Sequence, residues 1–69
     1  MELHVLFGNN VRHFRQLRGW SQEELAEATG LHRTYISGIE TGRRNPSLLI
    51  VSKIAAVLDV PPEQLLERR

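Results

Sequence analysis

Apolar residues recur at helical spacing in the first part of the chain. Four of them follow one another at steps of four, four and three residues: Leu3, Phe7, Val11 and Phe14. This spacing places them on one face of a helix, which we expect to run from Leu3 to about Arg18. Gly8 weakens the first half of this prediction because glycine is a poor helix former, and Gly19 is expected to end the helix.

Two short helices joined by a tight turn are predicted for residues 22–40. Their apolar positions are Leu25 and Ala26 in the first and Ile36 and Ile39 in the second. We expect the helices to span 22–28 and 33–40, with Gly30 in the left-handed conformation that commonly ends a helix. Two helices joined by a turn of about three to four residues have the geometry of a helix-turn-helix.

The start of the first of these helices carries its own signal. Ser21-Gln22-Glu23-Glu24 has the pattern of a capping box, in which Ser21 accepts a bond from the amide of Glu24 and the Glu24 side chain bonds back. Trp20 and Leu25 are spaced for the hydrophobic staple that accompanies such a cap. We therefore interpret Trp20 as a structural residue.

Residues 48–58 are apolar on nearly every face of a helix that Ser47 is placed to cap. We expect one stripe of this helix to complete the core with Leu65: Val51, Ile54, Ala55 and Leu58. The pair Pro61-Pro62 breaks the chain before a last short helix, from Glu63 to Glu67.

Three apolar residues of the same helix lie outside this predicted core stripe: Leu49, Ile50 and Val57. Because a helix that is apolar all round is buried on more than one side, the second side requires a partner. We expect a homodimer through about residues 47–67, using these three residues and Leu66.

Composition sets limits on the class of protein. The 69 residues make one domain, 1–69, with a small core, and they contain no cysteine. No apolar run approaches the length of a membrane span, and no leader pattern is present, so we expect a cytoplasmic protein without a membrane partner. The net charge of +1 is weak evidence for nucleic acid. The arginines are nevertheless clustered, at 12, 15 and 18 and at 33, 43 and 44, and ordinary solvated charges are the alternative explanation.

Nothing in the chain has the pattern of a catalytic or metal site. There is no nucleophile with a base at a suitable spacing and no histidine pair at ligand spacing, and His4 and His13 are interpreted as surface residues. We predict that the protein is not an enzyme and needs no metal or cofactor.

Four stretches together resemble a known family: Arg12-x-x-Arg15, GWSQEELA at 19–26, RTYISGIE at 33–40 and GRRNPS at 42–47. With them the chain resembles the phage-repressor/Cro-type (XRE-like) helix-turn-helix family from about Phe7 to Leu66, and RTYISGIE is most similar to the controller proteins of bacterial restriction–modification systems. The resemblance implies an all-α, compact five-helix bundle of the lambda-repressor-like type. It also implies a homodimer that binds double-stranded DNA at a pseudo-palindromic operator and regulates transcription, here of a restriction–modification operon.

The exposed N-terminal end of the second helix of this motif enters the major groove. Ile36, Ile39 and Glu40 are expected on the inner side of that helix. Base contacts are therefore expected from His32, just before this helix, and from its outward-facing residues, Arg33, Thr34, Ser37 and Gly38. Arg33 is the best candidate because a guanidinium can bridge both acceptors of guanine, with a phosphate contact as the alternative. His32 is a poor N-cap where the family often has Ser, Thr or Asp. Gly38 indicates that something approaches closely, and simple tolerance of a glycine is the alternative.

Phosphate contacts are expected from the residues around this helix: Gln22, Tyr35, Arg43, Arg44 and Asn45. Gln22 stands beside the free amides that begin its helix, and Tyr35 could equally be a packing residue. Arg43 and Arg44 follow the helix on a loop that we expect to lie too far back for base edges, and a solvated loop is the alternative.

Two further expectations concern charged residues. Arg15 and Glu40 lie at the edges of their core stripes, and a carboxylate at a helix C-terminus needs a cation nearby, so we predict a partly buried ion pair. Glu23, Glu24 and Glu27 are candidates for a patch that contacts RNA polymerase, as is any surface acid. The alternative to DNA binding is a helix-turn-helix module that binds protein, such as an antitoxin or a bridging subunit.

Overall fold

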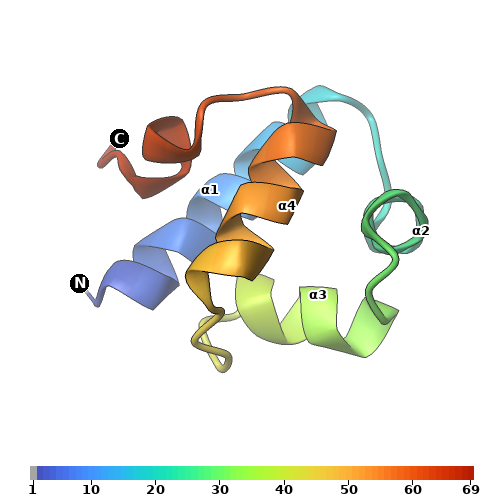
Figure 1. Ribbon diagram of the computed structural model, residues 1–69, viewed down its shortest axis with the longest axis horizontal. Coiled ribbons are helices and arrows are strands. Elements are labelled where there is room, and N and C mark those ends of the chain that lie inside the picture. Colours follow the sequence, from blue (N-terminus) through green and yellow to red (C-terminus); the bar gives the residue numbers. More distant parts are fainter. Residues whose placement is uncertain (1) are drawn as a thin grey trace.

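The computed structural model describes residues 2–69. Its elements are α1 (Leu3–Leu17), α2 (Gln22–Thr29), α3 (Arg33–Glu40), α4 (Leu48–Leu58) and the 3₁₀ helix η1 (Pro62–Leu66). No strand occurs among the residues described. In Figure 1, α4 lies in front of α1, α3 crosses below both, and α2 is seen end-on beside them. The all-α prediction is confirmed, and α2 and α3 form the expected helix-turn-helix.

The prediction of a fifth α-helix is wrong. Residues 62–66 form one short 3₁₀ helix rather than an α-helix, held by a bond from the Gln64 amide to the Pro61 carbonyl (3.0 Å). The side-chain amide of Asn10, buried in α1, donates to the carbonyls of Leu65 and Glu67 at 2.8 Å each. Asn10 thus satisfies carbonyls at the end of this short helix, which a helix leaves without an internal partner.

The helix ends follow the local signals in the sequence. The Glu24 amide donates to Ser21 Oγ (3.1 Å) and the Ser21 amide to Glu24 Oε1 (2.7 Å), so the capping box is confirmed. Gly30 ends α2 in the left-handed conformation (φ 75°). His32 precedes α3 and makes no side-chain hydrogen bond to the amides of its first turn, whereas its carbonyl accepts from the Tyr35 amide (3.0 Å).

The core is built from all five elements. Its members are Phe7, Val11, Leu25, Ala26, Ile36, Ile39, Ile54, Ala55, Leu58 and Leu65. Three residues of the predicted stripes are not fully buried: Leu3 is 60% exposed, and Phe14 and Val51 are half-buried against the core. Trp20 packs against this core under the Arg18 guanidinium (4.8 Å to the ring centre), in keeping with a structural role.

The predicted ion pair between Arg15 and Glu40 joins α1 to α3. Arg15 Nε and Nη2 donate to the two carboxylate oxygens of Glu40 at 2.7 and 3.0 Å, and both side chains are buried. Arg15 also donates to the Trp20 carbonyl (2.7 Å). The hydrogen bond from Arg15 to Glu40 raises the pKa of Arg15 despite its burial. This network ties the end of α3 to the turn that precedes α2.

Gly8 allows α1 and α3 to touch at their backbones. A Cβ at this position would overlap the carbonyl oxygen of Ile39 and lie 3.3 Å from the Glu40 carbonyl carbon. The glycine that weakened the helix prediction is thus required by helix packing.

We expect Gly8→Ala to lower the free energy of unfolding by about 2 kcal/mol. The overlap with a backbone costs about 3 kcal/mol, and better helix propensity recovers about 1 kcal/mol. Thermal unfolding should show a melting temperature roughly 8–16 °C lower. Gln16→Ala, at an exposed position of the same helix, is the matched control and should change little. An unchanged melting temperature for Gly8→Ala would show that α3 can shift at no cost.

Candidate nucleic-acid interface

The N-terminal half of α3 presents an exposed polar edge. His32, Arg33 and Thr34 are exposed, whereas Ile36 and Ile39 on the opposite side are fully buried. Glu40, held by Arg15, fixes the far end of the helix. The predicted division of α3 into an inner and an outer face is correct for these residues, and α3 lies along the lower edge of the molecule in Figure 1.

Gly38 is the exception on that face. It is buried, and the Arg44 side chain covers it: a Cβ built on Gly38 would lie 2.7 Å from Arg44 Cγ. The Arg44 guanidinium lies over the Tyr35 ring, 5.5 Å from its centre. Gly38 therefore lies on the outer face of α3 but is not exposed there, because Arg44 occupies the space above it.

Arg44 also lies in a different place from the one that we expected. The loop after α3 folds back, so that Thr34, Gly38, Arg43 and Arg44 line one shallow depression. Arg44 thus lies on the outer face of α3, beside the residues expected to read bases, rather than too far back. Arg43 lines the same depression, and its Nε donates to Thr41 Oγ1 (3.2 Å) beyond the end of the helix.

The other residues predicted to contact DNA are placed as follows. Gln22 is half-buried and its Nε2 donates to Glu40 Oε1 (3.0 Å), so one of its donors is directed inward. Ser37 and Tyr35 are half-buried on α3. Asn45 is exposed but lines a different hollow, with His4 and Pro46. The phosphate-contact prediction therefore fits Arg43 better than it fits Gln22 or Asn45.

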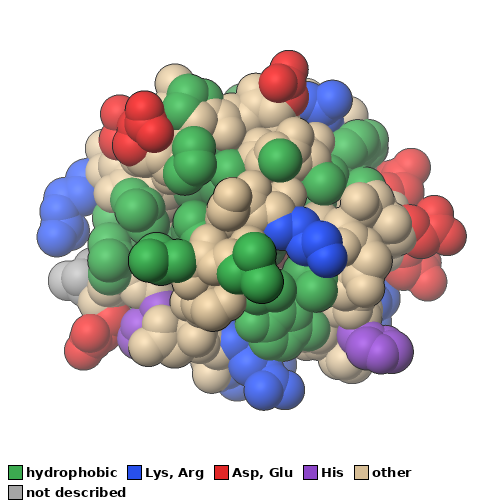
Figure 2. Space-filling view, in the orientation of Figure 1, with side chains coloured by type: hydrophobic (Ala, Val, Ile, Leu, Met, Phe, Trp, Pro, Cys, Tyr) green, Lys and Arg blue, Asp and Glu red, His purple; other side chains and the backbone are tan. Residues whose placement is uncertain are grey.

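Two arginines of the expected basic cluster serve the fold instead. Arg15 is paired with Glu40, and Arg18 Nη1 donates to the Leu58 carbonyl at the end of α4 (3.0 Å). The exposed arginines around α3 are Arg33, Arg43 and Arg44. Three of the exposed cations therefore lie on α3 and the loop after it, and Figure 2 shows acidic side chains at the right edge, over α2.

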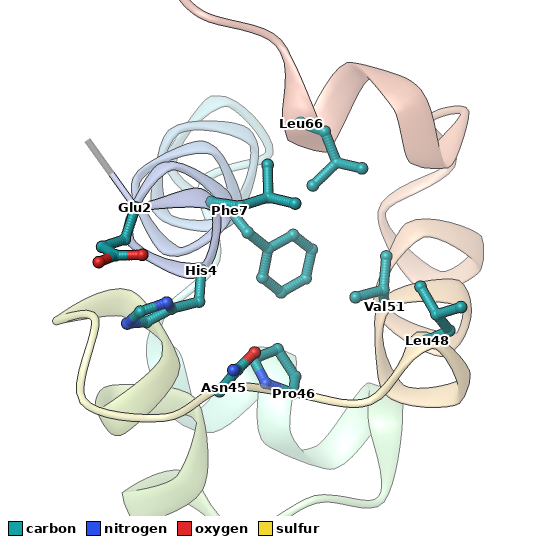
Figure 3. Close-up of a pocket in the computed structure, with 9 residues that line it drawn as sticks. Glu2, His4, Phe7, Asn45, Pro46, Leu48, Val51 and Leu66 are labelled. Carbon is teal, nitrogen blue, oxygen red and sulfur yellow. The ribbon is translucent and has the colours of Figure 1, made fainter.

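A second surface is apolar and lies on α4. Leu48 and Leu49 are 84% and 78% exposed at its N-terminal end. Next to them is a hollow of about 320 Å³, which Figure 3 shows between α1, α4, η1 and the loop before α4. Its apolar lining consists of Leu3, Phe7, Pro46, Leu48, Val51 and Leu66.

The predicted interface residues are only partly as expected. Leu49 is exposed, whereas Ile50, Val57 and Leu66 are half-buried and pack against the core. Leu48 and Leu3 are exposed apolar residues that the sequence interpretation did not include in an interface. Leu48 could have been found, because it is apolar at the first position of a helix that was already recognised as apolar all round.

Two other classes of site were sought among residues 2–69. No group of three or more histidine, aspartate or glutamate side chains is placed to hold a metal ion there. None of the helices in this part of the chain is both long enough and apolar enough to cross a membrane.

The arrangement of α2 and α3 agrees with a comparison of the sequence with protein families. A helix-turn-helix family profile (HTH_3) matches residues 11–65, from the middle of α1 to the 3₁₀ helix. The chain belongs to the helix-turn-helix family. Relatives in this family are DNA-binding transcriptional regulators rather than enzymes.

Relatives in the helix-turn-helix family include restriction–modification controller proteins. The control protein C.BamHI of Bacillus amyloliquefaciens is 48% identical over 66 residues, which cover 94% of this chain and 82% of that protein. A hypothetical transcription factor of Neisseria meningitidis is 48% identical over 65 residues, and the match spans 61% of that protein's length. The crystal structure of the controller protein C.AhdI of Aeromonas hydrophila superimposes with a TM-score of 0.85 at 45% identity, covering 90% of this chain and 94% of that one. The predicted resemblance is confirmed.

Proposed function

We propose that this helix-turn-helix protein binds a pseudo-palindromic operator as a homodimer and controls the transcription of a restriction–modification operon. The observation that carries the proposal is the exposed outer face of α3 with Arg33, Arg43 and Arg44 around it. Arg33 and Thr34 would reach base edges, together with His32 and Ser37, and Arg43 would contact phosphate. The identity with C.BamHI and C.AhdI supports the restriction–modification role.

The test is retardation of the DNA directly upstream of the protein's own gene, at moderate salt and with competitor DNA. We expect a specific complex that disappears on replacing Arg33, Arg43 and Arg44 together by alanine. Lys53→Ala removes an exposed cation on α4 and should leave binding unchanged. If the upstream DNA competes no better than unrelated DNA, the regulator is not autogenous. If the triple variant binds as well as the wild type, α3 is not the DNA-binding element.

The alternative function is a protein-interaction module, such as an antitoxin or a bridging subunit. Such a module would not require three exposed arginines around α3. A specific complex in the same retardation experiment would favour the regulator, because a module that binds only protein would form no specific complex with DNA.

The dimer in this proposal forms through the apolar surface of α4. A two-fold interface uses the same patch on both copies, and this patch carries both protruding leucines and a hollow: Leu48 and Leu49 beside the space in Figure 3. The two copies of α3 would then meet half-sites about 34 Å apart.

Leu49→Glu should weaken the dimer by at least about tenfold, or roughly 1.4 kcal/mol. The side chain is 78% exposed in the single chain, so the substitution tests the interface with little effect on the core, unlike Ile50→Glu at a half-buried position. Leu17→Glu is the matched control, because Leu17 is 68% exposed at the end of α1. Sedimentation equilibrium measures both. A monomeric wild type at tens of micromolar, or equal effects of the two variants, would contradict dimerisation through α4.

Transcriptional control implies a cytoplasmic location and a further contact with RNA polymerase if the protein activates. Glu24 is held in the capping box, so Glu23 and Glu27 are the exposed acids of α2 that remain available for such a contact.

A further inference from the structure

Gly38 lies in the middle of α3, where helix propensity does not favour a glycine. Its backbone does not need one either, because the glycines with positive φ are Gly19, Gly30 and Gly42. What the position requires is space. A Cβ on Gly38 would lie 2.7 Å from Arg44 Cγ, closer than packed carbon atoms can approach, and 3.4 Å from Arg44 Nε.

The Arg44 side chain is held in that space from both ends. At its backbone, the amides of Arg43 and Arg44 both donate to the Gly38 carbonyl, at 2.9 and 3.2 Å. At its tip, the guanidinium lies 5.5 Å from the centre of the Tyr35 ring, a distance at which a cation and an aromatic face attract. The side chain therefore crosses α3 instead of extending into solvent.

We propose that Gly38 is a positioning residue, which acts by seating Arg44 across the DNA-facing side of α3. The inference rests on the proposed function, since the seated guanidinium would meet the DNA beside Thr34. Seating matters because an arginine side chain has large rotational freedom, and a preorganised side chain loses less of it on binding. Gly38 itself need not touch the DNA.

The proposal differs from two simpler explanations of the glycine. If Gly38 allowed a phosphate or base to approach directly, an added methyl group would clash with DNA whether or not Arg44 is present. If Gly38 were merely tolerated, an added methyl group would change nothing in binding. A double-mutant cycle between Gly38 and Arg44 separates the three cases.

The experiment measures the affinity for the upstream operator duplex by fluorescence anisotropy, with thermal unfolding as the check on folding. We expect Gly38→Ala to melt at or above the wild-type temperature, because alanine is the better helix former, and to bind at least about tenfold more weakly (one 1.4 kcal/mol step). Arg44→Ala should lose a similar factor. The double variant should bind no more weakly than Arg44→Ala alone.

Arg43→Ala provides the matched background, because Arg43 is the neighbouring arginine and does not cover the Gly38 Cβ position. In that background Gly38→Ala should still cost about tenfold in affinity. An undiminished effect of Gly38→Ala in the Arg44→Ala background would overturn the proposal in favour of direct approach by DNA. Full affinity of Gly38→Ala would overturn it in favour of tolerance.

The position of the Arg44 side chain over Gly38 can also be tested without DNA. In the free protein, the NMR shift of the Arg44 Nε–H group should report the Tyr35 ring current, and Gly38→Ala should move that shift toward the value of an unstructured arginine. An unmoved resonance would refute the seat. A wild type that binds no DNA, with the resonance moving as expected, would instead refute the proposed function alone.

Discussion

Replacing Glu40 by alanine should lower the free energy of unfolding by about 3–5 kcal/mol, since breaking a buried ion pair leaves an unpaired charge in the interior. The side chain of Arg15 is 10% exposed and that of Glu40 is 3% exposed, and Arg15 would lose two of its three hydrogen bonds. A domain of this length has a total stability of roughly 3–10 kcal/mol. Thermal or urea unfolding should therefore show a variant that is at best marginally folded.

Two controls separate the ion pair from the loss of a carboxylate as such. Glu27→Ala removes an exposed glutamate from α2 and should shift the free energy of unfolding by no more than about 0.5 kcal/mol. The double replacement Arg15→Met/Glu40→Leu removes both charges, and buried pairs replaced in this way often lose little stability. A Glu40→Ala variant that melts within a degree or two of the wild type would show that the pair contributes nothing to folding.

The parts of the fold that the sequence predicted correctly depend on short-range signals. The Ser21 capping box, the left-handed Gly30 and the Ser47 cap act between residues at most four apart, so each could be recognised without knowing the tertiary structure. The Arg15–Glu40 pair was also predictable, although it spans 25 residues. Its prediction followed from two helix faces and the chemistry of a carboxylate at a helix end.

The parts that were missed depend on contacts between segments far apart in the sequence. Gly8 looked like a weakness of α1 because its benefit is the approach of α3, more than thirty residues later. The last helix is a 3₁₀ helix, and the side chain of Asn10 donates to carbonyls at its end, 55 and 57 residues away in the sequence. A helical pattern contains no information about either contact.

The candidate site shows the same division. The exposure of Arg33 and Thr34 followed from the helical period of α3, which buries Ile36 and Ile39. The position of Arg44 did not, because a loop residue can extend in many directions, and the one adopted depends on the space at Gly38 and on the Tyr35 ring. Sequence patterns therefore located the helix that we propose faces the DNA but not the way the following loop completes its surface.

We propose that Arg33 reads a base and that Arg43 contacts phosphate, so their alanine variants should lose affinity for DNA in different ways. Arg33 is exposed at the first position of α3, where a long side chain can reach into a groove. If it bridges the two acceptors of a guanine, Arg33→Ala should cost about 1–3 kcal/mol per half-site, or roughly 2–6 kcal/mol for the dimer. The loss should be concentrated at one base pair of each half-site.

Arg43 is the matched arginine, because its Nε bonds to Thr41 beyond the end of α3 and it follows the loop. Arg43→Ala should weaken binding to all sequences alike and lower the slope of log affinity against log salt by about two per dimer, since each protomer would neutralise one phosphate fewer. The measurement is a titration of each variant on the operator and on its single-base substitutions at several salt concentrations. If Arg33→Ala keeps the wild-type ranking of operator variants, base reading belongs to His32, Thr34, Ser37 or the seated Arg44 instead. If Arg43→Ala changes the ranking, Arg43 contacts a base rather than only phosphate.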